Sequence, residues 1–272
     1  MSRPLVTLLT DFGLRDPSAA ICRGVVLGIA PDAEVLDISH EVRKFAIRDG
    51  ALLLWCALPY LPVGTHVAVV DPGVGTARRP VAVRVGRGDV LVGPDNGLLL
   101  MAADWLGGVS AAVELREPAY RLPVVSTSFH GRDIFAPAAA HLALGVPLER
   151  LGPAIDPDAL VRLPIPVPQI REGALESHVV YVDTFGNVKL TALAPALREA
   201  LGPVAFGTPL ELAVDGRTHR VPWAETFGSI APGAPLLYED SYGRLCVAVN
   251  QGNAADALGF REDSAVSIRR AG

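Results

Sequence analysis

Apolar residues in the first half of the chain form runs whose lengths alternate between those of a strand and those of a helix. The strand-length runs stop at a polar residue or a glycine, and helix signals lie between them. One such signal is Asp16 followed by Pro17, a favourable N-cap and a favourable first helical residue. This alternation is typical of an α/β domain with a mainly parallel sheet. The predicted strands are 5–9, 33–38, 66–70, 81–85 and 89–92, and the predicted helices are 17–29, 47–61, 97–105 and 131–144.

The pattern changes after a proline-rich stretch. Residues 163–168 carry proline at alternate positions, which disfavours a helix and a central strand and favours a stiff extended linker. Beyond it, short apolar runs separated by Gly, Pro and Asp turns predict a small all-β domain. Its predicted strands are 179–182, 210–214, 236–238 and 245–249. We therefore expect an α/β domain over 1–162, a linker over 163–170 and an all-β domain over 171–272.

Composition and charge exclude several classes of protein. The chain has 272 residues, of which half are apolar and 19% are charged, and its formal net charge is -5 at pH 7. Its basic residues form no patch, and all but Lys44 and Lys189 are arginine, so we expect no nucleic-acid partner. No apolar stretch reaches about 18 residues, and the first residues lack a signal-peptide pattern. We expect no membrane span and a cytoplasmic location.

The cysteines indicate neither a disulfide framework nor a metal centre. Cys22, Cys56 and Cys246 are far apart, odd in number and set in apolar stretches, a pattern that favours buried thiols in a reducing compartment. No CxxC or His-rich cluster suggests a zinc site. Gly73-Val74-Gly75 follows a strand but lacks the third glycine and the helix of a dinucleotide fingerprint, and no P-loop, HExxH or GxSxG motif is present.

Two aspartates stand at places where buried strands end. Asp11 and Asp71 each follow a strand-length apolar run, and ligands bind outside the carboxyl ends of strands in open α/β sheets. The turn that starts at Asp71 can fold Arg78 back onto its carboxylate, which would keep Asp71 ionised and oriented. The residues alone leave a functional pair and a purely structural ion pair as equal alternatives.

His130 stands at the start of a predicted helix. The positive end of the helix dipole disfavours an imidazolium there, and a neutral imidazole can donate or accept a hydrogen bond at pH 7. A capping or packing role is the alternative. The other five histidines, which we interpret as structural or surface residues, are His40, His66, His141, His178 and His219.

A polar segment interrupts an apolar strand in the second half. It runs from Asp183 through Phe185 to Asn187. It is either a hairpin turn or a loop that offers a carboxylate, an aromatic face and an amide to a ligand.

Taken in order, these segments resemble those of the S-adenosylmethionine hydroxide adenosyltransferases, which are relatives of the bacterial fluorinase and chlorinase. Each segment is weakly specific alone, and the ordered set covers nearly the whole chain. The segments are Thr10-Asp11-Phe12-Gly13 with Asp16, Asp71 to Arg78, Phe129-His130-Gly131-Arg132-Asp133, Phe185-Gly186-Asn187, Ser241-Tyr242-Gly243 and Ala248-Val249-Asn250.

The resemblance implies an α/β domain, a barrel-like β domain and a homotrimer with its sites at subunit interfaces. It implies hydrolysis of S-adenosylmethionine to adenosine and methionine by attack of water at the ribose 5′ carbon, with no metal or organic cofactor. Asp71, Arg78 and His130 fall on the positions that handle the water. The halogenating relatives carry a tyrosine where this chain has Asp71, which favours water over a halide as the nucleophile.

The resemblance also implies a set of substrate-binding residues. Asp11 would hold the ribose hydroxyls, and Phe45 and Phe129 would pack against the nucleoside. Asp16, Asp183 and Ser241 would bind the amino and carboxylate groups of the methionine portion. The adenine would contact Asn187, Phe185 and Phe227, and the backbone after Val249, near Gln251.

Two positions depart from the family pattern. Tyr242 stands where the fluorinase has an arginine, and Asp240 stands where many relatives have an asparagine, so the resemblance leaves open how the charge of the substrate carboxylate is neutralised. Two alternative functions stay open, a halogenase of the same fold and a non-catalytic protein that binds adenosine or S-adenosylmethionine.

Overall fold

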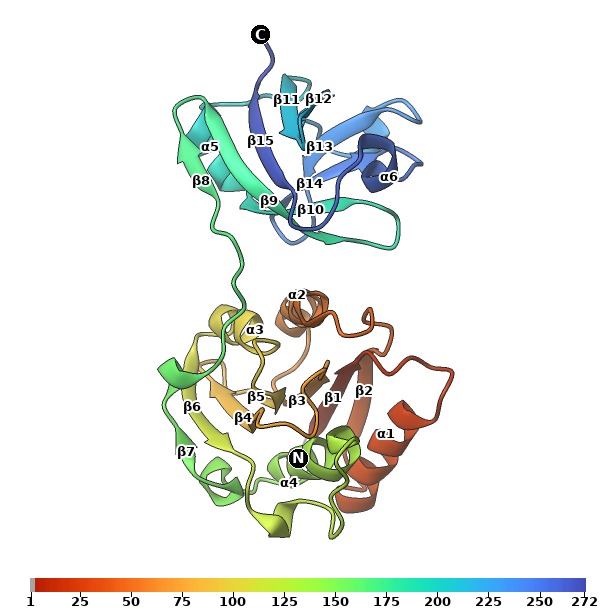
Figure 1. The fold of residues 1–272 in the computed structure, drawn as a ribbon, viewed down its shortest axis with the longest axis vertical. Coiled ribbons are helices and arrows are strands. Elements are labelled where there is room, and N and C mark those ends of the chain that lie inside the picture. Colours follow the sequence, from red (N-terminus) through yellow and green to blue (C-terminus); the bar gives the residue numbers. More distant parts are fainter. Residues whose placement is uncertain (1–2) are drawn as a thin grey trace. The chain divides into compact units, whose positions relative to one another are not determined.

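The computed structural model describes residues 3–272, which form two compact units (Figure 1). The first unit spans Met1–Leu163 and the second spans Pro164–Gly272. The division falls in the proline-rich segment, where residues 161–168 form neither helix nor strand. None of the helices within residues 3–272 is long and apolar enough to cross a membrane.

A seven-stranded sheet in the order β2-β1-β3-β5-β4-β6-β7 forms the centre of the first unit. The four strands from β2 to β5 pair in parallel, and the pairs from β5 through β4 and β6 to β7 are antiparallel. The expected α/β fold is therefore confirmed. The strands are β1 (Leu5–Thr10), β2 (Glu34–Ser39), β3 (Thr65–Val69), β4 (Pro80–Val85), β5 (Val90–Pro94), β6 (Val109–Glu114) and β7 (Ala154–Ile155).

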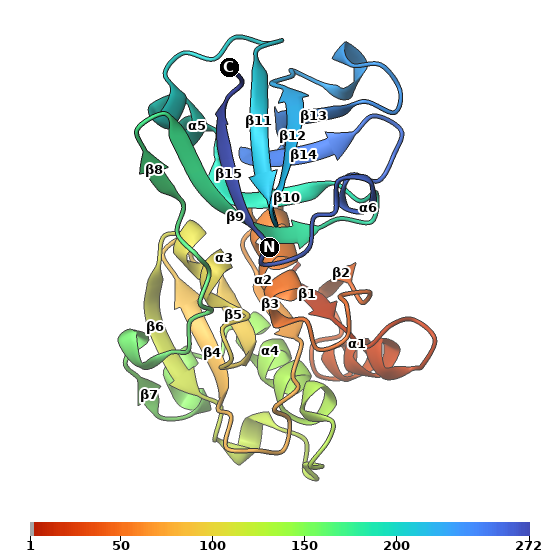
Figure 2. The ribbon, with the colours of Figure 1, turned by 45° about the horizontal axis from the view of Figure 1, so that its top comes forward.

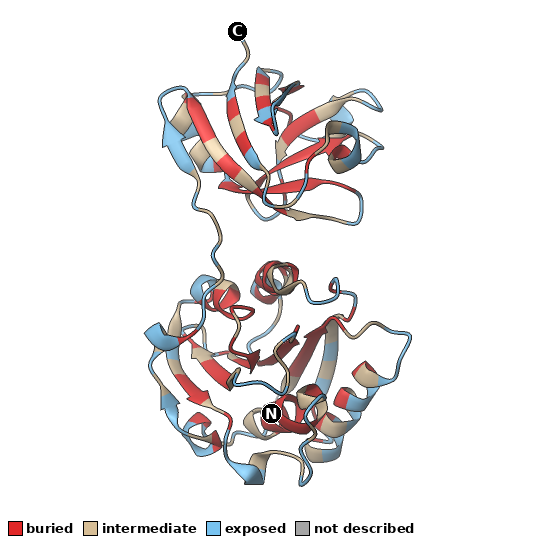
Figure 3. Ribbon diagram, in the orientation of Figure 1, coloured by how far each residue is buried: buried red, intermediate tan, exposed pale blue. Residues whose placement is uncertain are grey.

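Helices cover both faces of this sheet. Helices α1 (Ser18–Ile29) and α4 (Ala136–Ala143) pack together on one face, and α2 (Ile47–Ala57) and α3 (Leu100–Trp105) pack together on the other (Figure 1). The central strands are consequently buried on both sides (Figure 3), which explains their unbroken apolar runs. A π-helix occupies Gly131–Phe135, and 3-10 turns occupy Leu58–Tyr60, Pro118–Tyr120, Leu148–Leu151 and Pro157–Ala159.

The structure differs from the sequence prediction at several element ends. The helix expected over 17–29, with Asp16 as its N-cap, starts at Ser18, with Pro17 at the N-cap position and no side-chain cap. The helix expected over 97–105 is confined to α3. Strand β6 was not expected, since its Ser-Ala-Ala centre has low β-propensity. It forms because it pairs with β4 along its whole length.

The second unit is an antiparallel sheet that curls into a nearly closed barrel (Figure 2). The strand order is β12-β11-β15-β9-β10-β14-β13, and a bridge between Trp223 and Leu237 joins the two ends. The expected barrel-like β domain is confirmed. Its strands are β8 (Gln169–Arg171), β9 (Ala174–Val182), β10 (Val188–Leu193), β11 (Pro209–Val214), β12 (Arg217–Pro222), β13 (Pro235–Glu239), β14 (Arg244–Val249) and β15 (Ala265–Arg270), and its helical segments are α5 (Ala194–Leu201), Phe227–Ser229 and α6 (Ala254–Leu258).

A buried polar cluster joins three strands of the first unit. His66 on β3 contacts Thr7 on β1 through Nδ1 at 2.9 Å and Asp89 through Nε2 at 2.8 Å. Arg87 donates two further hydrogen bonds to Asp89, at 2.7 and 2.9 Å. Burial disfavours the charged form of Asp89, but the hydrogen bonds from His66 and Arg87 outweigh it and hold the pKa of that carboxyl well below its usual range. The cluster lies where β3 and β5 begin, and it ties these strands together.

Replacing Asp89 by asparagine should lower the free energy of unfolding by about 3 kcal/mol or more, because it leaves buried cationic and imidazole groups without their partner. Since folding lowers the pKa of Asp89 from its ordinary 3.8, this stabilisation is complete at neutral pH and is lost as the pH falls below that value. Urea unfolding at pH 7 measures the change. Asp104→Asn, which breaks an exposed ion pair with Arg162, is the matched control and should cost less than about 1 kcal/mol. Equal costs for both variants would contradict the assignment.

Candidate active site

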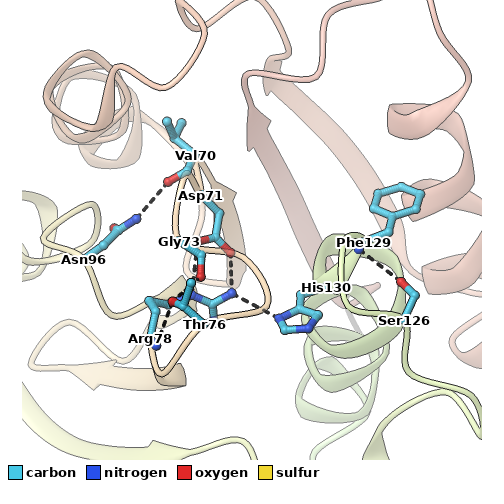
Figure 4. A network of polar contacts seen from close by, with 9 residues as sticks. All are labelled: Val70, Asp71, Gly73, Thr76, Arg78, Asn96, Ser126, Phe129 and His130. Atoms are coloured by element: carbon cyan, nitrogen blue, oxygen red, sulfur yellow. Dashed lines mark hydrogen bonds and ion pairs between the residues drawn. The ribbon is translucent and has the colours of Figure 1, made fainter.

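Two aspartates lie side by side at the carboxyl edge of the parallel strands. Strands β1 and β3 are parallel neighbours in which Thr10 is level with Val69. Asp11 follows Thr10 directly, and Asp71 follows Val69 after one intervening residue, Val70. The Asn96 side chain donates to the Val70 carbonyl at 2.9 Å and holds the chain at the start of the Asp71 turn (Figure 4).

Arg78 folds back onto Asp71 in a two-point contact. Its Nε donates to Asp71 Oδ1 at 3.1 Å, and its Nη2 donates to Asp71 Oδ2 (Figure 4). Only 7% of the Arg78 side chain and 5% of the Asp71 side chain are exposed. The guanidinium also lies over the Phe135 ring, 5.4 Å from its centroid. A buried pair with this geometry fixes both groups more firmly than an exposed one.

The same guanidinium reaches His130. Arg78 Nη2 lies 3.1 Å from His130 Nδ1, and because a guanidinium only donates, Nδ1 is the acceptor. The neutral ring therefore carries its proton on Nε2. Burial, and next the charge of Arg78, lower the pKa of His130 from its ordinary 6.5. We expected a neutral imidazole because of a helix dipole, whereas burial and the neighbouring arginine are the principal causes.

Two loops pack closely to place these groups. Gly75, at φ +77°, brings the Asp71 turn against the Thr127 backbone, where a Cβ would lie 2.4 Å from the carbonyl oxygen. The buried Asp133 carboxylate accepts hydrogen bonds from the Ser126 backbone and hydroxyl at 2.8 and 2.7 Å. His130 immediately precedes the π-helix, and π-helical turns are frequent at functional sites.

A cavity of about 400 Å³ opens beside this cluster in the first unit. Asp11 accepts a hydrogen bond from the Phe45 backbone N–H at 2.9 Å through Oδ2, and Lys44 Nζ donates to the Asp11 carbonyl. Phe45 has φ 65°, an unfavourable backbone conformation for a bulky residue, and 69% of it is exposed. Phe129 lies edge-on to Phe12 on the same cavity wall. The residues that line the cavity thus include both carboxylates and aromatic rings.

The second unit has a larger pocket, of about 960 Å³. The tight turn from Asp183 to Asn187 contributes to its lining. In this turn Asp183 Oδ1 accepts hydrogen bonds from the backbone N–H groups of Phe185 and Asn187, both at 2.9 Å. The Asn187 amide nitrogen donates to Asp183 Oδ2 at 2.9 Å, which leaves the amide oxygen as an acceptor. Phe227 packs against Tyr238, with ring centroids 5.0 Å apart.

The proposed site residues divide between these two cavities. Those of the first unit are Asp11, Phe45, Asp71, Phe129 and His130, with Arg78 directly behind Asp71. Those of the second are Asp183, Phe185, Asn187, Phe227, Ser241, Val249 and Gln251. Asp16 is exposed and lines neither cavity.

Two cavity residues were not among the expected site residues. Lys44 lines the first cavity and Lys189 lines the second. They are the two lysines of the chain, so their rarity was the signal that could have pointed to them. Within residues 3–272, no three His, Cys, Asp or Glu side chains are grouped as a metal site would require.

The chain belongs to the family of S-adenosylmethionine hydroxide adenosyltransferases. The N-terminal domain of that family matches residues 6–152, and its C-terminal domain matches residues 177–267. Together these matches cover most of the chain and include all the residues that we expected in the site.

Named relatives and a solved structure agree with this membership. The chain is 50% identical to the (R)-S-adenosyl-L-methionine hydrolase of Salinispora arenicola, over 94% of each chain. It is 44% identical to the protein of the same name from Thermus thermophilus, over 97% of this chain and 98% of that one. A fluorinase from Nocardia brasiliensis is 29% identical over 98% of this chain and 97% of its own length. The structure of an uncharacterized conserved protein from Thermotoga maritima matches with a TM-score of 0.91 at 33% identity, over 97% of this chain and all of that one.

Replacing Arg78 by methionine should raise the pKa of His130. The variant removes both the positive charge and the N–H donor that oppose protonation of Nδ1, and it leaves the Asp71 carboxylate to favour the imidazolium. NMR titration of the histidine C–H resonances measures the shift. His141, whose pKa is lowered by burial alone, is the internal control and should titrate alike in both proteins. An unchanged or lower pKa of His130 would contradict the arrangement.

Proposed function

We propose that this protein hydrolyses S-adenosyl-L-methionine to adenosine and L-methionine, by in-line attack of water at the ribose 5′ carbon. The observation that carries the proposal is the buried Asp71–Arg78 pair with His130 beside it, at a cavity, in a chain of this family. Because the relatives from Salinispora arenicola and Thermus thermophilus are named as hydrolases of the (R)-sulfonium epimer, we extend that epimer to this chain.

The chemical difficulty lies in aiming the nucleophile. A sulfonium leaves as a neutral thioether, so its departure needs no proton donor. Water is a weak nucleophile and must be held in line with the C–S bond. Such positioning can contribute up to about 7–11 kcal/mol in ideal cases, which makes rigid placement of the water the principal task of the site.

Asp71 and the neutral His130 divide that task. Asp71 accepts a hydrogen bond from the water, and Arg78 keeps its carboxylate in one orientation. His130 receives the second Arg78 contact at Nδ1, which places the proton of its neutral ring on Nε2 and fixes the ring beside Asp71. As the C–O bond forms and the C–S bond breaks, the water loses one proton, first toward Asp71 and then to solvent. The products are adenosine, methionine and that proton.

The two cavities suit different parts of the substrate. We assign the ribose hydroxyls to Asp11 and the nucleoside faces to Phe45 and Phe129. Asn187 presents an amide oxygen that can accept from the adenine amino group. The remaining assignments follow the family pattern: Phe185, Phe227, Val249 and Gln251 around adenine, and Asp16, Asp183 and Ser241 around the methionine portion.

We further propose a homotrimer in which the first unit of one subunit and the second unit of its neighbour complete each site. The division of the site residues between two separate cavities supports this proposal. The protein requires neither a metal nor an organic cofactor in this scheme, since no step needs electrophilic or redox assistance.

Purified protein should convert (R)-S-adenosyl-L-methionine to equal amounts of adenosine and L-methionine. Asp71→Asn should cut turnover at least about 100-fold while binding of the substrate persists, because the nucleophile loses its main acceptor. Chromatography of the products measures both. A substrate deuterated at one C5′ position should show inversion at that carbon.

Each alternative function has its own outcome in the same assay. A 5′-chloro-5′-deoxyadenosine product in the presence of chloride, without adenosine, would indicate a halogenase. Tight binding of adenosine without any product would indicate a binding protein. Near wild-type adenosine release by Asp71→Asn would overturn the assignment of the water-handling residues.

Mixing two inactive variants should restore activity. Asp71→Asn disables the first-unit half of a site, and Asn187→Ala disables the second-unit half. After subunit exchange of equal amounts, about a quarter of the sites would combine two intact halves if each site spans two subunits. Mixtures of Asp71→Asn with His130→Ala, both in the first unit, are the control and should stay inactive. Failure of the first mixture after proven exchange would contradict the shared site.

A further inference from the structure

Lys189 is a buried cation in the wall of a pocket rich in carboxylates. It lies on β10, and 11% of its side chain is exposed. Among the described residues that line this pocket, it is the one lysine or arginine. The acidic residues of the lining are Asp183, Glu225, Glu239 and Asp240. Burying an ammonium costs free energy unless other groups pair with it. A buried ammonium in the lining of a pocket is therefore a candidate for binding a ligand.

Neighbouring groups fix the position of the Lys189 ammonium. Its Nζ lies 2.5 Å from Asp240 Oδ2 and 5.2 Å from the centre of the Tyr242 ring. The other oxygen of Asp240 accepts from the backbone N–H groups of Tyr242 and Arg244, both at 2.9 Å. The Asp240 carboxylate is thus anchored by the β13–β14 turn and orients the ammonium.

The charges of the proposed substrate make this cation useful. S-Adenosylmethionine carries a sulfonium and an ammonium, which the acidic residues of the pocket attract, and a carboxylate, which they repel. A carboxylate enters such a pocket favourably only where a cation meets it. Lys189 is the one lysine or arginine among the described residues of this lining, so it is the side chain placed to meet that carboxylate.

We infer that Lys189, oriented by Asp240 and Tyr242, binds the α-carboxylate of the substrate and selects amino-acid sulfonium compounds over those without a carboxylate. This inference rests on the proposed function, since it assumes an S-adenosylmethionine substrate. Lys189 contacts no reacting atom in this assignment. It acts on substrate binding and leaves the chemical step to the groups of the first unit.

The test compares S-adenosylmethionine with its decarboxylated analogue, which lacks only the carboxylate. The variant is the double substitution Lys189→Met with Asp240→Asn, which removes both buried charges together and leaves neither unpaired. For S-adenosylmethionine, KM should rise about 10- to 100-fold with little change in kcat, as expected for a lost hydrogen bond between charged groups. For the analogue, KM should change less than about threefold. Lys189→Arg, which keeps the charge, should retain most of the preference for S-adenosylmethionine.

Several outcomes would overturn the inference. Equal losses for both compounds would make Lys189 a structural residue of the barrel, and a wild-type enzyme that does not prefer S-adenosylmethionine over the analogue would remove the need for a carboxylate partner. Thermal unfolding of each variant shows whether the barrel is intact. Calorimetric binding of both compounds gives the same comparison without turnover. If the wild type binds S-adenosylmethionine with the expected preference but releases no adenosine, the proposed function fails while the role of Lys189 stands.

Discussion

The arrangement of the first-unit site depends on one guanidinium that serves two partners. Arg78 engages both oxygens of Asp71 and also donates to His130 Nδ1. One side chain therefore sets the orientation of a carboxylate and the tautomer of an imidazole. Both effects need burial, because in water the contacts would be screened and mobile. The close approach of the Asp71 turn and the loop before the π-helix supplies that burial, and the glycine at position 75 permits the approach.

The fold separates what stabilises the sheet from what forms the site. The Thr7–His66–Asp89 cluster ties strands together where β3 and β5 begin, whereas Asp11 and Asp71 follow the ends of β1 and β3. The amino-end cluster is completely buried and satisfies its own hydrogen bonds. The carboxyl-end groups line a cavity. This separation lets the sheet keep a rigid edge on which a less stable arrangement, such as Phe45 at positive φ, can be held.

Much of the fold could be predicted from the sequence, because buried parallel strands leave unbroken apolar runs that end at polar residues. Strands that form only because they pair with a neighbouring strand could not be predicted in this way. Strand β6 has a Ser-Ala-Ala centre and forms through pairing with β4, and β12 begins with four mostly exposed polar residues and forms through pairing with β11. The start of α1 was predicted at Pro17 with Asp16 as its N-cap, but the helix begins at Ser18 without a side-chain cap. Local propensity cannot foresee such tertiary effects.

The charges of the site could likewise be predicted from the sequence only in part. Polar residues after strands and the ordered family motifs pointed to Asp11, Asp71 and His130. The lowered pKa of His130 has causes that only the folded structure reveals, namely the partial burial of its ring and the adjacent charge of Arg78. For Lys189 the sequence offered only the rarity of lysine, with no motif around it on β10. Its meaning depends on Asp240, which is 51 residues away, and on the acidic residues around it. An isolated strand lysine is therefore understood only with the carboxylate that the β13–β14 turn brings to it.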